Sequence, residues 1–241
     1  MSRILKVAAL QMPTQTPYRR NLDRLLMHID ELGDHDIILA PEVSMTDYDY
    51  EHLDEAVMFG EEVIQVLTER VGHQVVGLTL LTQQKDGRYT NDAVVIHDHR
   101  IVHRQSKHKL FLLGEEDKHL AAGTQEAIHV FEIDGLRYGM LICFELRFKE
   151  LWRQLEGADI ILVPSQWGMP RKRHLEILAQ ALAVMNQAYV VVANTSREDM
   201  ASSSAICSPG GGVVMEDMQE VIRGEIDLGL IKKMRRYIVM K

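Results

Sequence analysis

The stretch 34–42, DHDIILAPE, decides the fold because it recurs in outline at 157–166 as GADIILVPSQ. Both copies follow a helix-period segment, continue as an aliphatic run after an aspartate, and end in a proline followed by polar residues. Such a run predicts a buried strand, and the polar residues after it would lie at the carboxyl end of the sheet, where α/β proteins commonly place their functional sites. The alternative is an ordinary buried strand that ends at a proline and has no functional role. Two equivalent helix-strand units indicate pseudo-symmetric halves, in which two sheets pack together with helices outside.

Aliphatic runs alternate with helix-period segments along the whole chain, a pattern that is typical of an α/β layered domain. We expect helices at 18–32, 54–71, 148–155 and 172–187, and strands at 4–10, 36–40, 74–81, 92–97, 101–104, 127–133, 138–143, 159–163, 188–193, 204–207, 212–215 and 221–226. No linker or low-complexity segment interrupts this alternation, so a single domain over 1–241 is expected.

The composition is that of an ordinary globular protein, with 46% hydrophobic and 26% charged residues among 241. A net charge of -8 argues against nucleic acid as a partner, since phosphate binding needs concentrated Lys and Arg, and favours small-molecule chemistry. Two cysteines are too few for a disulfide framework and indicate a reducing compartment. Lys6 breaks the N-terminal apolar run, and no other run is long enough for a membrane span. We therefore expect a cytoplasmic protein with no membrane partner.

One cysteine stands where an apolar run meets charged residues, in LICFELRFKEL at 141–151. Cys143 would lie at a strand end, where the N-terminus of a following helix can favour the anionic form of the thiol. That arrangement is one way to build a nucleophile. A free cysteine is also among the residues most often buried, so a small buried hydrophobe is the alternative interpretation.

A thiol nucleophile needs a base, and none of the eleven histidines is an obvious one. The four histidines in HDHRIVHRQSKHK at 97–109 match no metal signature, so no metal site is expected. Glu42 follows a buried strand, where desolvation would raise its pKa toward the range of a general base. Lys107 precedes the loop FLLGEEDKHLAAG, in which Glu116 is a second carboxylate. By charge pattern alone this region is an ordinary solvated loop.

Together these motifs resemble those of the nitrilase superfamily of carbon-nitrogen hydrolases. The glutamate in LAPE, the lysine in KHKLF and the cysteine in ICFELRFKEL occur in the family's order, and the last is similar to the family's I-C-Y-D-x-R-F-P-E-L. The segments VPSQW, ALAVMNQAYVVVAN and SSSAICSPGGGVV match as well, so the resemblance covers 7–226. It implies a four-layer αββα sandwich, no metal or organic cofactor, and a homodimer or higher homo-oligomer.

The resemblance also implies roles for particular residues. It makes Cys143 the nucleophile, Glu42 the general base and Lys107 the cationic stabiliser of an oxyanion. Glu116 corresponds to the family's second glutamate, which would orient the lysine, and the backbone N–H of Phe144 would be a second oxyanion donor. The implied reaction is hydrolysis of a small amide, such as an ω-amide of a dicarboxylate, through a Cys thioester. Hydrolysis of a nitrile or an N-carbamoyl amino acid, and a catalytically silent homologue, are the alternatives.

Three further residues are candidates for binding the substrate. Arg147 lies one helical turn beyond the cysteine and could hold a substrate carboxylate in bidentate fashion, or could instead pair with Glu145 or Glu150. Gln166 and Trp167 follow a strand end and could line the pocket, although Trp167 could equally serve packing. The resulting partner is a small-molecule amide.

The chain departs from the family's pattern at positions that bear on the pocket and the dimer surface. These are Asp47 for a glycine, Lys109 for a histidine, Glu145 for an aspartate, Lys149 for a proline, and Leu182 and Met185 for an arginine and a glutamate. Since the last two changes remove both charges together, neither charge is left unpaired and packing should survive.

Overall fold

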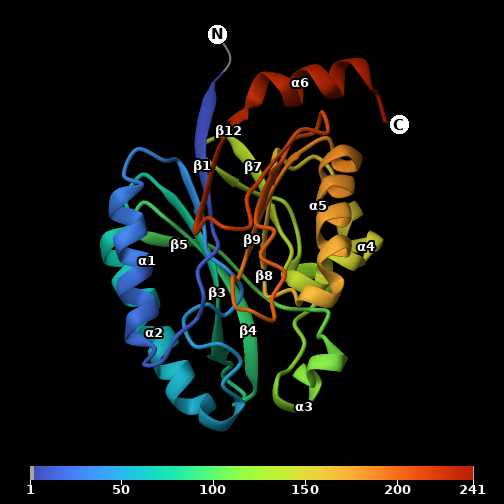
Figure 1. Ribbon diagram of the computed structural model, residues 1–241. Coiled ribbons are helices and arrows are strands. Elements are labelled where there is room, and N and C mark those ends of the chain that lie inside the picture. The colour runs from blue at the N-terminus through green and yellow to red at the C-terminus, as the bar shows by residue number, and fades with distance from the viewer. Residues whose placement is uncertain (1–2, 241) are drawn as a thin grey trace.

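The computed structural model describes residues 3–240, which form two six-stranded sheets packed face to face (Figure 1). The first sheet has the spatial order β12 (Val221–Asp227), β1 (Ile4–Leu10), β2 (Ile37–Leu39), β3 (Val75–Gln83), β4 (Tyr89–His97) and β5 (Arg100–Ser106). The second has the order β11 (Val213–Met215), β10 (Ala205–Cys207), β9 (Tyr189–Asn194), β8 (Ile160–Ser165), β7 (Leu136–Met140) and β6 (Phe131–Ile133). The repeated motif supplies β2 and β8, each parallel to both of its neighbours.

Helices cover the outer face of each sheet and complete four layers (Figure 1). On the first sheet these helices are α1 (Arg19–Glu31) and α2 (Leu53–Arg70), and on the second they are α4 (Lys149–Gln154) and α5 (Lys172–Asn186). The short helix α3 (Glu116–His119) lies at one end of the molecule and α6 (Leu228–Tyr237) at the other. The αββα sandwich expected from the sequence is therefore confirmed.

Side chains of β2 alternate between two apolar layers, as the period of two in a strand requires. Ile37 and Leu39 join the core shared with the second sheet, whereas Ile38 packs with the apolar side chains of α1 and α2. Burying one such side chain contributes about 1.5–3 kcal/mol relative to exposure. This packing on both faces fixes the carboxyl end of β2, and with it the loop that follows.

The structure differs from the expected elements mainly in four places. Residues 127–130 are not strand, because Gln125–Ala127 forms a 3-10 turn and β6 begins only at Phe131. The strand expected at 138–143 ends at Met140, and a 3-10 helix, η4 (Cys143–Arg147), begins at the cysteine. Helices α3 and α6 were not expected, and Ile231 is the one buried residue of α6. Within residues 3–240, no helix is both long enough and apolar enough to cross a membrane.

Candidate active site

Cys143 lies on a sharp turn between β7 and α4. Its φ is 47°, in the left-handed region that residues other than glycine seldom adopt. Such a conformation costs about 1–3 kcal/mol and is maintained only where the surrounding structure enforces it. The turn points the Cys143 side chain away from the direction that a continued strand would give it. Cys143 is 7% exposed. The sulfur is therefore accessible only through a pocket.

Glu42 reaches the same place from the first sheet. It follows β2, and its backbone N–H donates to the carbonyl of Ser165 at the end of β8 (3.2 Å), so the two repeated motifs meet here. The side chain is 1% exposed. Its Oε1 accepts three hydrogen bonds, from the Lys107 ammonium (2.8 Å), the Tyr48 hydroxyl (2.7 Å) and the Asn91 side-chain amide (2.9 Å). These donors offset the cost of burying the carboxylate charge.

Lys107 follows β5 and is fully buried between two carboxylates. Its Nζ lies 2.8 Å from Glu42 Oε1 and 2.7 Å from Glu116 Oε1. Burial alone would lower the pKa of Lys107, but the two carboxylates outweigh it and raise the pKa above its ordinary value. Glu116 is anchored in turn, because its Oε2 accepts the backbone N–H of Phe111 (3.0 Å). The lysine is thus held as an ammonium in one orientation.

The thiol of Cys143 is neutral at rest. Burial and the carboxylate of Glu42 raise its pKa well above the ordinary value, and the Lys107 ammonium and the Gln166 backbone N–H offset only part of this effect. Burial and the nearby carboxylate thus outweigh any preference for the anion at the N-terminus of the five-residue η4. A sulfur in this environment becomes nucleophilic only when a neighbouring base takes its proton.

A cavity of about 470 Å³ opens onto these side chains and is lined by Glu42, Glu116 and Cys143. An adjoining recess beside the sulfur is lined by residues that include Phe144, Arg147, Gln166 and Trp167. The structure thus brings all eight candidate residues to one place.

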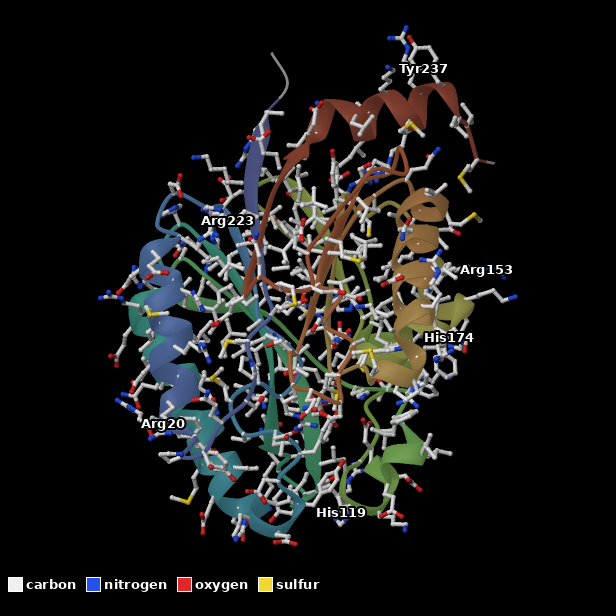
Figure 2. The ribbon with its side chains drawn as sticks, in the orientation of Figure 1. Arg20, His119, Arg153, His174, Arg223 and Tyr237 are labelled. Atoms are coloured by element: carbon white, nitrogen blue, oxygen red, sulfur yellow. The ribbon has the colours of Figure 1, made fainter. Side chains whose placement is uncertain are left out.

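His119, labelled at the lower end of the molecule in Figure 2, stacks on Tyr50 of the cavity wall (4.1 Å between ring centroids). Among residues 3–240, no three His, Cys, Asp or Glu side chains are grouped as metal ligands.

Arg147 points its guanidinium into this recess rather than into an ion pair. It lies over the Trp167 ring (4.7 Å to the centroid) and contacts Nδ1 of His174 (3.1 Å). His174, which is labelled in Figure 2, belongs to helix α5. Glu150 instead pairs with a lysine, and Glu145 accepts backbone N–H groups. The alternative of an ion pair between Arg147 and either glutamate is therefore wrong.

Arg171 adds a second guanidinium to the same recess. It lies over the Phe111 ring (5.2 Å to the centroid). Burial and this neighbouring positive charge lower the pKa of Arg147. In the part of the chain that the structure describes, neither guanidinium has a carboxylate partner within salt-bridge distance. Because two adjacent guanidinium groups lie here without a carboxylate partner, the recess favours binding of a negatively charged group.

The comparison with known proteins agrees with this geometry. Residues 6–236 match the family model described as carbon-nitrogen hydrolase. The chain belongs to the carbon-nitrogen hydrolase family. It is 28% identical over 221 residues to 2-oxoglutaramate amidase of Bacillus subtilis (strain 168), a match that covers 86% of this chain and 85% of the relative. It is 25% identical over 235 residues to Omega-amidase YafV of Escherichia coli (strain K12), covering 94% of this chain and 90% of the relative.

A solved structure shows the same fold. XC1258 from Xanthomonas campestris, a CN-hydrolase superfamily protein, aligns with a TM-score of 0.87 at 21% sequence identity, covering 98% of this chain and 95% of that one. The expectation of a carbon-nitrogen hydrolase is thus confirmed.

The hydrolase accommodates most of its departures from the family's pattern without strain. Leu182 is fully buried and Met185 is half exposed on α5, so neither position leaves a buried charge. Lys109 pairs with Glu150 (3.3 Å), and Lys149 is exposed at the first position of α4. These substitutions therefore lie outside the group of contacts around the sulfur.

Glu145 ties the turn that carries the cysteine to the loop that carries the lysine. Its Oε2 accepts the backbone N–H of Ile142 (2.7 Å) and its Oε1 that of His108 (2.6 Å). Each of these residues is the direct neighbour of a candidate catalytic residue. Burial raises the pKa of Glu145 to about 7, although the backbone N–H groups oppose the shift.

The raised pKa of Glu145 predicts a pH-dependent stability. Between its unfolded pKa of 4.5 and its folded pKa of about 7, the folded state binds more protons, so stability falls as pH rises through this window. Relative to Glu145→Gln, the free energy of unfolding of the wild type should fall by about 3 kcal/mol across it. Urea denaturation of both proteins at a series of pH values measures this difference. Identical pH dependence in the two proteins would contradict the assignment.

Sequence reasoning missed two donors to Glu42. Asn91 lies in the polar stretch 90–92 at the start of β4 and precedes the strand expected at 92–97, so no apolar pattern marked it as buried. Tyr48 lies six residues after Glu42 in a loop and matches no spacing rule. Burial raises the pKa of Tyr48 well above its ordinary value, which keeps the hydroxyl a donor. Arg171 was missed as well, because no pattern in the sequence shows that a loop arginine lacks a partner.

Proposed function

We propose that this hydrolase cleaves the terminal amide of a small acid, an ω-amide of a dicarboxylate, to the acid and ammonia. The observation that carries the proposal is one cavity in which Cys143, Glu42 and Lys107 meet beside two guanidinium groups without carboxylate partners. The names of the two amidase relatives support an amide substrate. The substrate's amide would lie at the sulfur and its carboxylate in the recess.

In the first half of the reaction, Glu42 takes the Cys143 proton and the sulfur attacks the amide carbonyl carbon. The carbonyl oxygen becomes an oxyanion, which the Lys107 ammonium and the Phe144 backbone N–H stabilise. One lost oxyanion donor costs about 3 kcal/mol of barrier. Glu42 then passes its proton to the leaving nitrogen, the C–N bond breaks, and ammonia departs from a thioester.

In the second half, water replaces ammonia. Glu42 deprotonates the water as it attacks the thioester carbon, and the same oxyanion donors stabilise the second tetrahedral state. The C–S bond breaks, the proton returns to the Cys143 sulfur, and the acid leaves. Glu116 keeps Lys107 charged and oriented throughout, as its 2.7 Å contact allows. No step requires a metal or an organic cofactor.

The substrate's second end is recognised by charge. Arg147 and Arg171 can each donate two N–H groups to a carboxylate, and its negative charge would relieve their mutual repulsion. Phe144 and Trp167 supply apolar walls for the carbon chain between the two ends. A nitrile or an N-carbamoyl amino acid with a carboxylate would fit the same recess, so parallel assays on matched amide, nitrile and N-carbamoyl compounds separate these reactions.

Replacing Arg171 tests the charge recognition. Arg171→Met is expected to raise KM for an ω-amide about 10–100-fold, because one charge-assisted contact is lost, and to leave hydrolysis of a neutral amide of equal length unchanged. Coupled detection of ammonia measures the hydrolysis of the ω-amide and of the neutral amide. Arg173→Met, which removes an exposed arginine from α5, is the matched control. Equal losses on both amides would refute a carboxylate-binding role.

We further propose a single domain and a homodimer or higher homo-oligomer in the cytoplasm. The family model spans nearly the whole chain, which supports one domain. Both cysteines are free, which suits a reducing compartment. Light scattering after size-exclusion chromatography measures the oligomeric state, and a monomer at all concentrations would reject that part of the proposal.

A further inference from the structure

Asp47 has a backbone conformation that favours glycine. Its φ is 58°, and the family resemblance places a glycine at this position. The left-handed region is unfavourable for an L-residue, but aspartate tolerates it better than most because its short carboxylate can bond locally. Contacts of the Asp47 side chain must offset the rest of this conformational free energy.

The Asp47 carboxylate joins loops from both sheets. Its Oδ1 accepts the side-chain amide of Gln166 after β8 (2.6 Å) and the backbone N–H of Tyr48 (2.9 Å). Its Oδ2 pairs with the guanidinium of Arg197, which follows β9. Asp47 itself follows β2 of the first sheet, so these contacts fasten the two halves of the fold to each other beside the cavity.

Arg197 is held from a second side. Its Nε donates to Asp199 (3.2 Å), and the carbonyl of Asp199 accepts the backbone N–H of Met169 (2.8 Å). Asp47, Arg197 and Asp199 line the same cavity as Cys143. The Asp47 and Arg197 side chains are 34% and 32% exposed, so they form part of the wall rather than of the core.

We propose that Asp47 and Arg197 form a wall that limits the size of the group beside the reacting carbon. Gln166, whose side chain Asp47 holds, lines the same recess as Cys143, so this wall lies beside the nucleophile. A glycine at position 47 would remove the common partner of Gln166 and Arg197 and open the cavity there. An ion pair this exposed contributes little to stability, so its main effect is on access.

The consequence for substrates depends on the proposed function. Asp47→Gly is expected to raise kcat/KM for a long or branched acyl amide relative to a short ω-amide by about tenfold or more, since a pocket distinguishes single methylene groups by that much. Asp47→Asn keeps a residue that tolerates positive φ and loses only the charge, so it should give a smaller change in the same direction.

A second readout does not require that the proposed function be right. Cys143 is alkylated with iodoacetamide and with a bulky N-aryl iodoacetamide, and the modified cysteine is identified by peptide mass spectrometry. The ratio of the two rates reports access alone, because the ionisation of the thiol affects both reagents equally. The wild type should strongly favour the small reagent, and Asp47→Gly and Arg197→Gln should each reduce that preference about tenfold or more.

Controls separate this wall from a general loosening of the protein. Asp86→Asn removes a more exposed ion pair, Asp86 with Arg88 (2.7 Å), from the turn between β3 and β4, away from the cavity, and should leave the ratio unchanged. The double variant Asp47→Gly, Arg197→Gln should match the single variants, because both act on one contact. If both single variants unfold thermally as the wild type does and show the same ratio of alkylation rates, the proposed wall is overturned. If the variants change access of the reagents to Cys143 but the protein has no amidase activity, only the proposed function is overturned.

Discussion

Cys143→Ala is expected to abolish ammonia release, with a loss of at least about 10⁴-fold in kcat, because no thioester can form without the sulfur. The fold should persist, since the side chain is small and the turn is held by the surrounding contacts. Steady-state assays with an ω-amide measure the loss, and circular dichroism checks that the variant is folded. Binding of the dicarboxylate product should survive in this variant, because the recess with Arg147 and Arg171 is untouched.

The second cysteine supplies the control for that experiment. Cys207 is buried in β10, and burial raises its pKa to about 12, so it is an inert thiol. Cys207→Ala should retain the activity of the wild type. Ammonia release at the wild-type rate by Cys143→Ala would end the assignment of the nucleophile.

Lys107→Met is expected to lower both activity and stability. Removing the ammonium leaves the carboxylates of Glu42 and Glu116 buried without their shared cation, which should cost about 3–5 kcal/mol in the free energy of unfolding. Loss of the oxyanion contact should lower kcat about 10²–10³-fold. Urea denaturation and ammonia release measure the two effects.

The pH dependence of this variant identifies the cause of the destabilisation. If uncompensated negative charge is responsible, lowering the pH to about 5 should restore part of the lost stability relative to the wild type, because protonation removes that charge. Glu116→Gln, which keeps the lysine and one of its carboxylates, should be destabilised much less. A deficit in Lys107→Met that is constant across pH would point to packing instead.

Most elements of the fold could be predicted from the sequence, because their apolar periods report which side of a strand or helix is buried. The strand β1 at Ile4–Leu10 matches its expected bounds, since its apolar side chains enter the two core layers from Leu5 to Leu10. The errors fall where local pattern and tertiary packing disagree. Residues 127–130 have strand-like side chains but lie in and after a 3-10 turn. Helix α6 is a different case, because its sequence does carry an amphipathic helical period that the expected elements left out.

The order of motifs in the sequence was enough to name Glu42, Lys107, Glu116 and Cys143 as candidates, because each residue type lies in a recognisable local context. Their mutual distances belong to the tertiary structure alone, since the contact between Glu42 and Lys107, 65 positions apart, arises only when the strands of the first sheet assemble in order. The protonation state of the thiol is decided there too, because burial and a nearby carboxylate govern it and neither is encoded locally. The same reason explains why the donors to Glu42, the two guanidiniums without carboxylate partners, and the left-handed turns at Cys143 and Asp47 became visible only in the folded chain.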